Sequence, residues 1–151
     1  MLKEFIRPAL ISLQVKVSNW EEAVRKAGNL MVQAGYCEDR YVDAMVQAVS
    51  DMGPYMVLAP GIALAHARPE DGMLKVGMSL INLAVPVEFG SEKNDPVSLV
   101  IAFGGVDKEK HVKMLQHLSQ FLLDEGNQEL LKSTNSVEEI ISALAEEPSS
   151  S

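Results

Sequence analysis

Val97-Ser98-Leu99-Val100-Ile101-Ala102-Phe103 is a continuous apolar run that is followed directly by Gly104-Gly105. An uninterrupted apolar run is typical of a strand that is covered on both faces, because such a strand has no side that faces solvent. The two glycines are expected to end the strand, and Asp107 is expected to cap a helix that reaches about Asp124. This stretch therefore predicts a sheet enclosed by helices.

The flanking segments alternate between strand and helix patterns. Further strands are predicted over residues 10–17, 55–58 and 73–87, and further helices over residues 18–34, 38–51, 127–132 and 136–145. Two capping boxes, Ser18 with Glu21 and Ser136 with Glu139, mark helix starts, whereas residues 59–69 are interpreted as irregular. Interleaved strands and helices predict an α/β, three-layer α-β-α sandwich with a small mixed sheet covered by helices on both faces.

Length and composition set limits on the class of protein. The 151 residues, 47% of them hydrophobic, suit a single domain, predicted here over residues 1–145 with a disordered tail over 146–151. A net charge of −8 argues against nucleic-acid binding, which needs a basic surface. A membrane-spanning helix needs about 20 apolar residues, and no such run occurs, so we expect a soluble, cytoplasmic protein without direct membrane insertion.

His66 is the strongest candidate for chemistry. It lies in a turn rich in small residues, bracketed by Gly61 and Pro69, where an imidazole stays accessible and backbone N–H groups can approach an anion. Arg68 lies two residues further on and suits pairing with a phosphate. The alternative is that His66 is merely exposed or structural.

Two further histidines lie on the helix after the apolar run. His111 falls in the first turn and lines up with Leu115, Leu118 and Leu122, so it is either a packing residue or a polar group facing a pocket. A helix N-terminus disfavours imidazolium, which favours a neutral His111. His117 lies about 120° further round the helix, is expected to face solvent or a crevice, and is given no role.

Other chemistries find little support. The single cysteine, Cys37, excludes an intramolecular disulfide and a thiolate zinc cluster, and its neighbours Glu38 and Asp39 are expected to raise the thiol pKa. No metal site is predicted, because the histidines lack metal-ligand spacing. Gly104-Gly105 matches neither of the common nucleotide-binding glycine patterns.

Pro60–Pro69 (PGIALAHARP) resembles the phosphorylation site of enzyme IIA proteins of the mannitol/fructose superfamily of the sugar phosphotransferase system, whose pattern is G-I-A-[IL]-P-H. Residues 97–118 resemble the second strand–helix block of that family and carry His111. Residues 136–141 resemble its final helix, so the resemblance spans nearly the whole chain.

Within this superfamily, residues 56–69 look most like the L-ascorbate-type branch. Two positions depart from the wider pattern. Ser50-Asp51 stand where mannitol-type members carry Arg-Glu, and Ala65 stands where the family usually has proline. Arg68 is the candidate to replace the missing arginine as the cationic partner of the phosphate.

The resemblance implies a phosphoryl relay without a metal or nucleotide cofactor. A histidine phosphocarrier protein donates to His66, and His66 passes the group to a cognate IIB component, which phosphorylates a sugar during transport by a membrane IIC permease. The branch implies L-ascorbate, or next a pentose or pentitol. His111 is expected to stabilise the phosphate or the His66 ring, and backbone N–H groups of Ala67 and Arg68 to bind phosphate oxygens.

An apolar surface around His66 is expected to serve both partners in turn, with Ile62, Leu64 and Met73 as candidates, although ordinary core packing also explains Ile62. Two alternatives to transport stay open. One is a regulatory IIA-like module that binds a target protein according to its phosphorylation state. The other is a non-catalytic scaffold with an incidental histidine.

Overall fold

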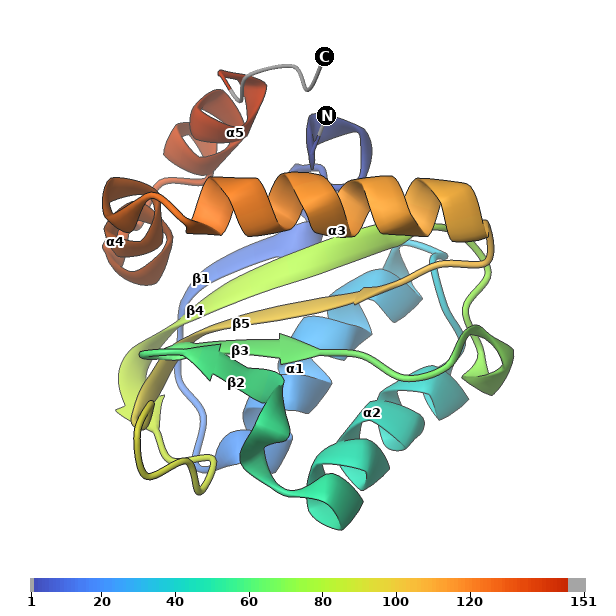
Figure 1. Cartoon of the computed structure of the whole chain (residues 1–151), viewed down its shortest axis with the longest axis horizontal. Helices are drawn as coiled ribbons and strands as arrows, with labels where there is room; N and C mark the ends of the chain where they lie inside the picture. Colours follow the sequence, from blue (N-terminus) through green and yellow to red (C-terminus); the bar gives the residue numbers. More distant parts are fainter. Residues whose placement is uncertain (1, 147–151) are drawn as a thin grey trace.

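One five-stranded sheet lies between two layers of helices (Figure 1). The structure is a computed structural model and describes residues 2–146. The strands are β1 (Ile11–Val15), β2 (Val57–Ala59), β3 (Ile62–Ala65), β4 (Gly77–Val87) and β5 (Val97–Gly104). The helices are α1 (Trp20–Gln33), α2 (Asp39–Met52), α3 (Lys108–Leu122), α4 (Glu125–Ser133) and α5 (Val137–Ala145). Short 3-10 helices are η1 (Leu2–Glu4), η2 (Pro8–Leu10), η3 (Pro54–Met56) and η4 (Pro69–Asp71).

The sheet is mixed and has the strand order β1-β4-β5-β3-β2. β1 is parallel to β4, and β3 is parallel to β5, whereas the β4–β5 and β2–β3 pairs are antiparallel. β5 therefore lies in the middle, and the side chains of Leu99, Val100, Ile101 and Ala102 have no exposed surface. The prediction of a strand covered on both faces is confirmed.

The helices divide between the two faces of the sheet. α1 and α2 lie on one face, and α3, α4 and α5 lie on the other (Figure 1). The α/β three-layer sandwich predicted from the sequence is confirmed. None of the helices within residues 2–146 is long and apolar enough to cross a membrane. Of the predicted tail, Glu146 is the C-cap residue that follows α5, and residues 147–151 lie outside the described part of the chain.

Two local predictions need correction. Asn19, not Ser18, caps α1, and its side chain accepts a hydrogen bond from the Glu22 amide at 2.9 Å. Ser18 and Asn19 are both good capping residues, and each is followed by a Glu three residues later. The sequence pattern therefore does not decide between these two positions. The segment 59–69 is also not irregular throughout, because it contains β3, which the sequence analysis missed.

β3 is a four-residue strand that follows a tight turn. Gly61 adopts a φ of +76°, a conformation that glycine reaches without strain, and the turn reverses the chain from β2 into β3. β3 then pairs with β5 from Ile62 opposite Leu99 to Ala65 opposite Ala102. The carboxyl ends of these two parallel strands meet at one edge of the sheet, where crevices in α/β sheets bind ligands.

Candidate functional site

His66 is the first residue after β3, and it is half-buried. Its ring stacks on the ring of Phe103, with centroids 4.9 Å apart and an interplanar angle of 18°. Tyr55 lies edge-on to the same imidazole, with a centroid distance of 6.4 Å. The His66 ring is thus held by aromatic neighbours while part of it stays accessible.

The backbone selects between the two ring nitrogens of His66. Nδ1 lies 3.4 Å from the carbonyl oxygen of Leu64, and a carbonyl only accepts hydrogen bonds. This contact favours the tautomer that carries its proton on Nδ1. The lone pair of the neutral ring is then on Nε2, which is the nucleophilic atom.

His111 also lies near Phe103, whose ring centroid is 5.9 Å from that of His111. Gly105 makes this approach possible, because a Cβ there would lie 3.1 Å from Nδ1 of His111. Burial lowers the pKa of His111, a positive charge on the nearby His66 ring would lower it further, and the nearby Gly104 backbone opposes both effects. The structure therefore brings His66 and His111 into one cluster and favours a neutral His111.

The lowered pKa of His111 predicts a stability that depends on pH. The unfolded chain, with an ordinary value of 6.5, binds a proton at His111 before the folded chain does, so acid favours unfolding. The stabilising contribution is complete above about pH 6.5 and falls as the pH drops toward the folded pKa. We expect the urea midpoint to fall less between about pH 7.5 and pH 5.5 in His111→Gln than in the wild type. Equal falls in both proteins would contradict this assignment.

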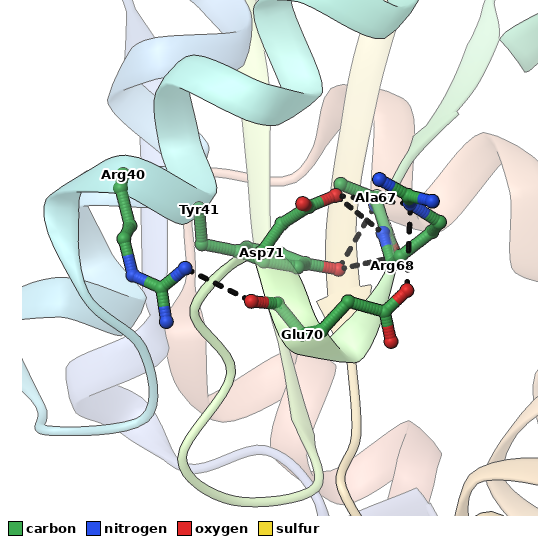
Figure 2. Close-up of polar contacts among 6 residues, drawn as sticks. All are labelled: Arg40, Tyr41, Ala67, Arg68, Glu70 and Asp71. Carbon is green, nitrogen blue, oxygen red and sulfur yellow. Dashed lines mark hydrogen bonds and ion pairs between the residues drawn. The ribbon is translucent and has the colours of Figure 1, made fainter.

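The backbone amides predicted to bind phosphate already have partners inside the chain. The Ala67 amide donates to the Tyr41 hydroxyl at 3.0 Å, and the Arg68 amide donates to Oδ2 of Asp71 at 3.2 Å (Figure 2). Neither amide is therefore available to a phosphate in this conformation. The sequence showed which amides follow His66, but it did not show where they point.

The Arg68 side chain is 77% exposed and pairs with acidic neighbours. Its Nε lies 3.4 Å from Glu70 and 3.6 Å from Asp71 (Figure 2). Exposed ion pairs of this kind contribute about 0–1 kcal/mol, so they do not fix Arg68 in place. A phosphate carries more negative charge than either carboxylate and competes well for the guanidinium.

Two of the three predicted docking residues are corrected. Ile62 is 1% exposed and Met73 is 5% exposed, so both belong to the core, and Leu64 is half-buried. The exposed apolar side chains on elements next to His66 are instead Tyr55 of η3, Leu58 of β2 and Val106 after β5. The sequence does not show which β3 side chains face solvent, because the residues on both faces of this strand are apolar.

Two other predictions were also tested by the structure. The prediction that His117 faces solvent or a crevice is wrong, because His117 is one of the buried residues of α3, with 7% exposure. The expected rise in the thiol pKa of Cys37 is confirmed. Burial raises that pKa to about 11, and the charges of Asp39 and Glu38 add to the effect.

The amino-acid sequence and the fold both match one family of proteins. Residues 4–147 match the family described as phosphoenolpyruvate-dependent sugar phosphotransferase system, EIIA 2. The chain belongs to this family. It is an EIIA component of the sugar phosphotransferase system, a class of phosphotransfer proteins.

Curated relatives of this EIIA chain carry a specific substrate in their names. The ascorbate-specific EIIA component of Salmonella typhimurium is 37% identical over 135 residues, which are 89% of this chain and 88% of the relative. The ascorbate-specific EIIA component of Escherichia coli strain K12 is 36% identical over the same shares of the two chains.

Solved structures of EIIA proteins share the fold. The solution structure of the mannitol-specific cryptic phosphotransferase enzyme IIA of Escherichia coli superposes with a TM-score of 0.84 at 30% identity, over 96% of this chain and 99% of that one. The mannitol enzyme IIA of Escherichia coli in complex with phosphorylated enzyme IIB gives a TM-score of 0.81 at 34% identity, over 93% and 96% of the two chains. The second structure shows an EIIA protein bound to its phosphorylated IIB partner.

Proposed function

We propose that this EIIA chain accepts a phosphoryl group on Nε2 of His66 from a histidine phosphocarrier protein and passes it to a cognate IIB component. The observation that carries the proposal is the position of His66 at the carboxyl end of β3, with Nδ1 toward the Leu64 carbonyl and the ring stacked on Phe103. The complex of the mannitol EIIA relative with phosphorylated IIB supports the acceptor.

The proposed transfer conserves the proton on His66 throughout. The lone pair on Nε2 attacks the phosphorus of the donor phosphohistidine, an Nε2–P bond forms, and the donor P–N bond breaks with its electron pair left on the donor ring. Transfer to IIB reverses these steps, and the proton on Nδ1 stays near the Leu64 carbonyl. Such a reaction depends mainly on in-line positioning and charge stabilisation.

Charge stabilisation is assigned to the side chains around His66. A neutral His111 retains one N–H donor, which suits a phosphate oxygen or the His66 ring. Arg68 is the proposed cationic partner of the phosphate once it leaves Glu70 and Asp71. The exposed side chains Tyr55 and Leu58 are proposed to replace Ile62 and Met73 in the docking surface for both partners.

The substrate of the coupled IIB–IIC system is proposed to be L-ascorbate. The support is the naming of the curated relatives that are 36–37% identical over 89% of the chain. The nitrogen regulatory IIA protein of Neisseria meningitidis, at 22% identity, shares the fold alone and gives no support to the regulatory alternative.

The test is the intact mass of the wild-type protein after incubation with phosphoenolpyruvate, enzyme I and the histidine phosphocarrier protein. We expect the mass of one acid-labile phosphoryl group to be added, and then lost when an ascorbate-type IIB is supplied. A mannitol-type IIB serves as the matched control for substrate class. A wild-type mass that does not change with a cognate carrier would rule out the phosphotransfer role, and equal discharge to both IIB proteins would rule out the ascorbate assignment.

A further inference from the structure

Tyr41 is a buried residue that contacts the backbone on both sides of the His66 cluster. It lies in the first turns of α2 and has no exposed surface. Its hydroxyl accepts the Ala67 amide at 3.0 Å and lies 3.2 Å from the Ala67 carbonyl oxygen (Figure 2). It also lies 2.8 Å from the Phe103 carbonyl oxygen. The Tyr41 hydroxyl therefore links Ala67, which follows His66, to Phe103, on which the His66 ring stacks.

The position of this hydroxyl follows from the register of the sheet. In the β3–β5 pair, the Leu99 amide donates to the Gly61 carbonyl, and the register runs on to Ala65 opposite Ala102. Continued by one residue, this register places His66 opposite Phe103 and directs the Ala67 amide to the Phe103 carbonyl. The Tyr41 hydroxyl stands between these two groups, accepting from one and donating to the other.

We propose that Tyr41 is a positioning residue for phosphoryl transfer at His66, because its hydroxyl extends the β3–β5 ladder and sets the backbone that carries the ring. The inference rests on the proposed function of His66. Without the inserted hydroxyl, Ala67 and Phe103 would pair directly, and the peptide after His66 would shift toward β5. That shift would change the contact of Nδ1 with Leu64 and the stacking on Phe103.

Two further features fit this role. Burial raises the pKa of Tyr41 to about 12, so the hydroxyl stays protonated and keeps both its donor and its acceptor capacity. Gly104 leaves room for the hydroxyl, because a Cβ at that position would lie 2.5 Å from the Tyr41 oxygen. The lack of a side chain at Gly104 therefore leaves the space that the Tyr41 hydroxyl shares with the Met73 side chain.

The test uses Tyr41→Phe, which keeps the buried ring and removes the oxygen alone. We expect the maximal rate of His66 phosphorylation to fall about 10- to 100-fold, because misplacement of a reacting group by a fraction of an ångström to one ångström has effects of this size. The apparent KM for the phosphocarrier should stay close to that of the wild type, since the docking surface is unchanged.

Ser79→Ala is the matched control for lost stability. The Ser79 hydroxyl is also fully buried and also donates to a backbone carbonyl, that of Ala27 at 2.6 Å, on the face of the sheet away from His66. The control should melt at a lower temperature than the wild type and still be phosphorylated at the wild-type rate. A Tyr41→Phe rate within about twofold of the wild type, or an equal fall in Ser79→Ala, would overturn the positioning role.

A second measurement does not depend on phosphorylation. Nitrogen-15 NMR of the His66 ring reports the tautomer, and the wild type should hold its proton mainly on Nδ1. In Tyr41→Phe we expect a mixed tautomer population and a displaced Ala67 amide resonance. Ring shifts identical to the wild type would overturn the inference even if the carrier fails to phosphorylate either protein, which by itself would count only against the proposed function.

Discussion

His66→Gln is expected to abolish phosphoryl acceptance from the histidine phosphocarrier protein. Glutamine keeps a polar side chain of similar reach, but its amide nitrogen has no nucleophilic lone pair, so no P–N bond can form. His111→Gln should still accept one phosphoryl group, at a rate about 10²- to 10³-fold lower, which is the usual effect of removing one donor to a developing charge. Intact mass over a time course distinguishes a lost acceptor from a slowed one.

His117→Gln is the control for the loss of a histidine. His117 lies on α3 like His111, but it is buried away from the Phe103 ring cluster, with 7% exposure. This variant should be phosphorylated at the wild-type rate as long as it folds. Phosphorylation of His66→Gln to the wild-type extent would assign the acceptor to another residue, and a wild-type rate in His111→Gln would remove that residue from the mechanism.

The sequence was sufficient to predict the layered fold because the strongest patterns came from the most buried elements. The 97–103 run became the central strand β5, and the capping signals at Asp107 and Ser136 both hold, with side chains that accept from the Lys110 and Glu139 amides. β3 escaped prediction because four apolar residues after a turn carry no periodicity that separates strand from loop. These four residues form a strand because they pair with β5, and the local sequence does not show this long-range contact.

The candidate site, like the fold, was predicted only where the local sequence carries a signal. His66 and His111 were found from their positions relative to predicted elements, and the structure places both rings near Phe103. Phe103 was assigned only to the strand, because an aromatic residue in an apolar run is normally core. Tyr41 is one of the buried residues of α2, and nothing in the nearby sequence shows that its hydroxyl meets the ends of β3 and β5. A role that depends on one buried polar atom can be predicted only when the pairing register of distant strands is known.

Asn82 is a second buried polar residue whose partners lie on distant elements. Its replacement is expected to lower the free energy of unfolding more than any other substitution considered. It lies on β4 with no exposed surface. Its Oδ1 accepts the backbone amide of Gln14 at 2.6 Å, and its Nδ2 donates to the carbonyls of Leu131 at 3.0 Å and Thr134 at 2.8 Å. One side chain thus ties β1 and the end of α4 to the sheet.

The three backbone partners of Asn82 lack regular hydrogen-bond partners of their own, and two of their residues, Leu131 and Thr134, are buried. Gln14 has a φ of +53° at an irregularity in the β1–β4 pairing, so its amide does not follow the ordinary ladder. The Leu131 and Thr134 carbonyls lie at the end of α4, where helical acceptors lack intrahelical donors. Removing the amide group takes the Asn82 side chain away from all three backbone groups and leaves the Thr134 carbonyl only its 3.4 Å contact with Nε2 of Gln14. Each unsatisfied buried group costs about 1–3 kcal/mol.

We therefore expect Asn82→Leu, which keeps the number and branching of the side-chain heavy atoms, to lower the free energy of unfolding by about 3–5 kcal/mol, whereas Ser79→Ala on the same strand should lower it by about 1 kcal/mol. Urea unfolding of both variants gives the comparison, and unchanged m-values would show that both still unfold in one step. Because Asn82 lies away from the His66 cluster, the folded fraction of Asn82→Leu should accept phosphate at the wild-type rate. A loss no larger than that of Ser79→Ala would mean that the stranded carbonyls and the Gln14 amide find other partners, and that β1 and α4 are held by apolar packing rather than by Asn82.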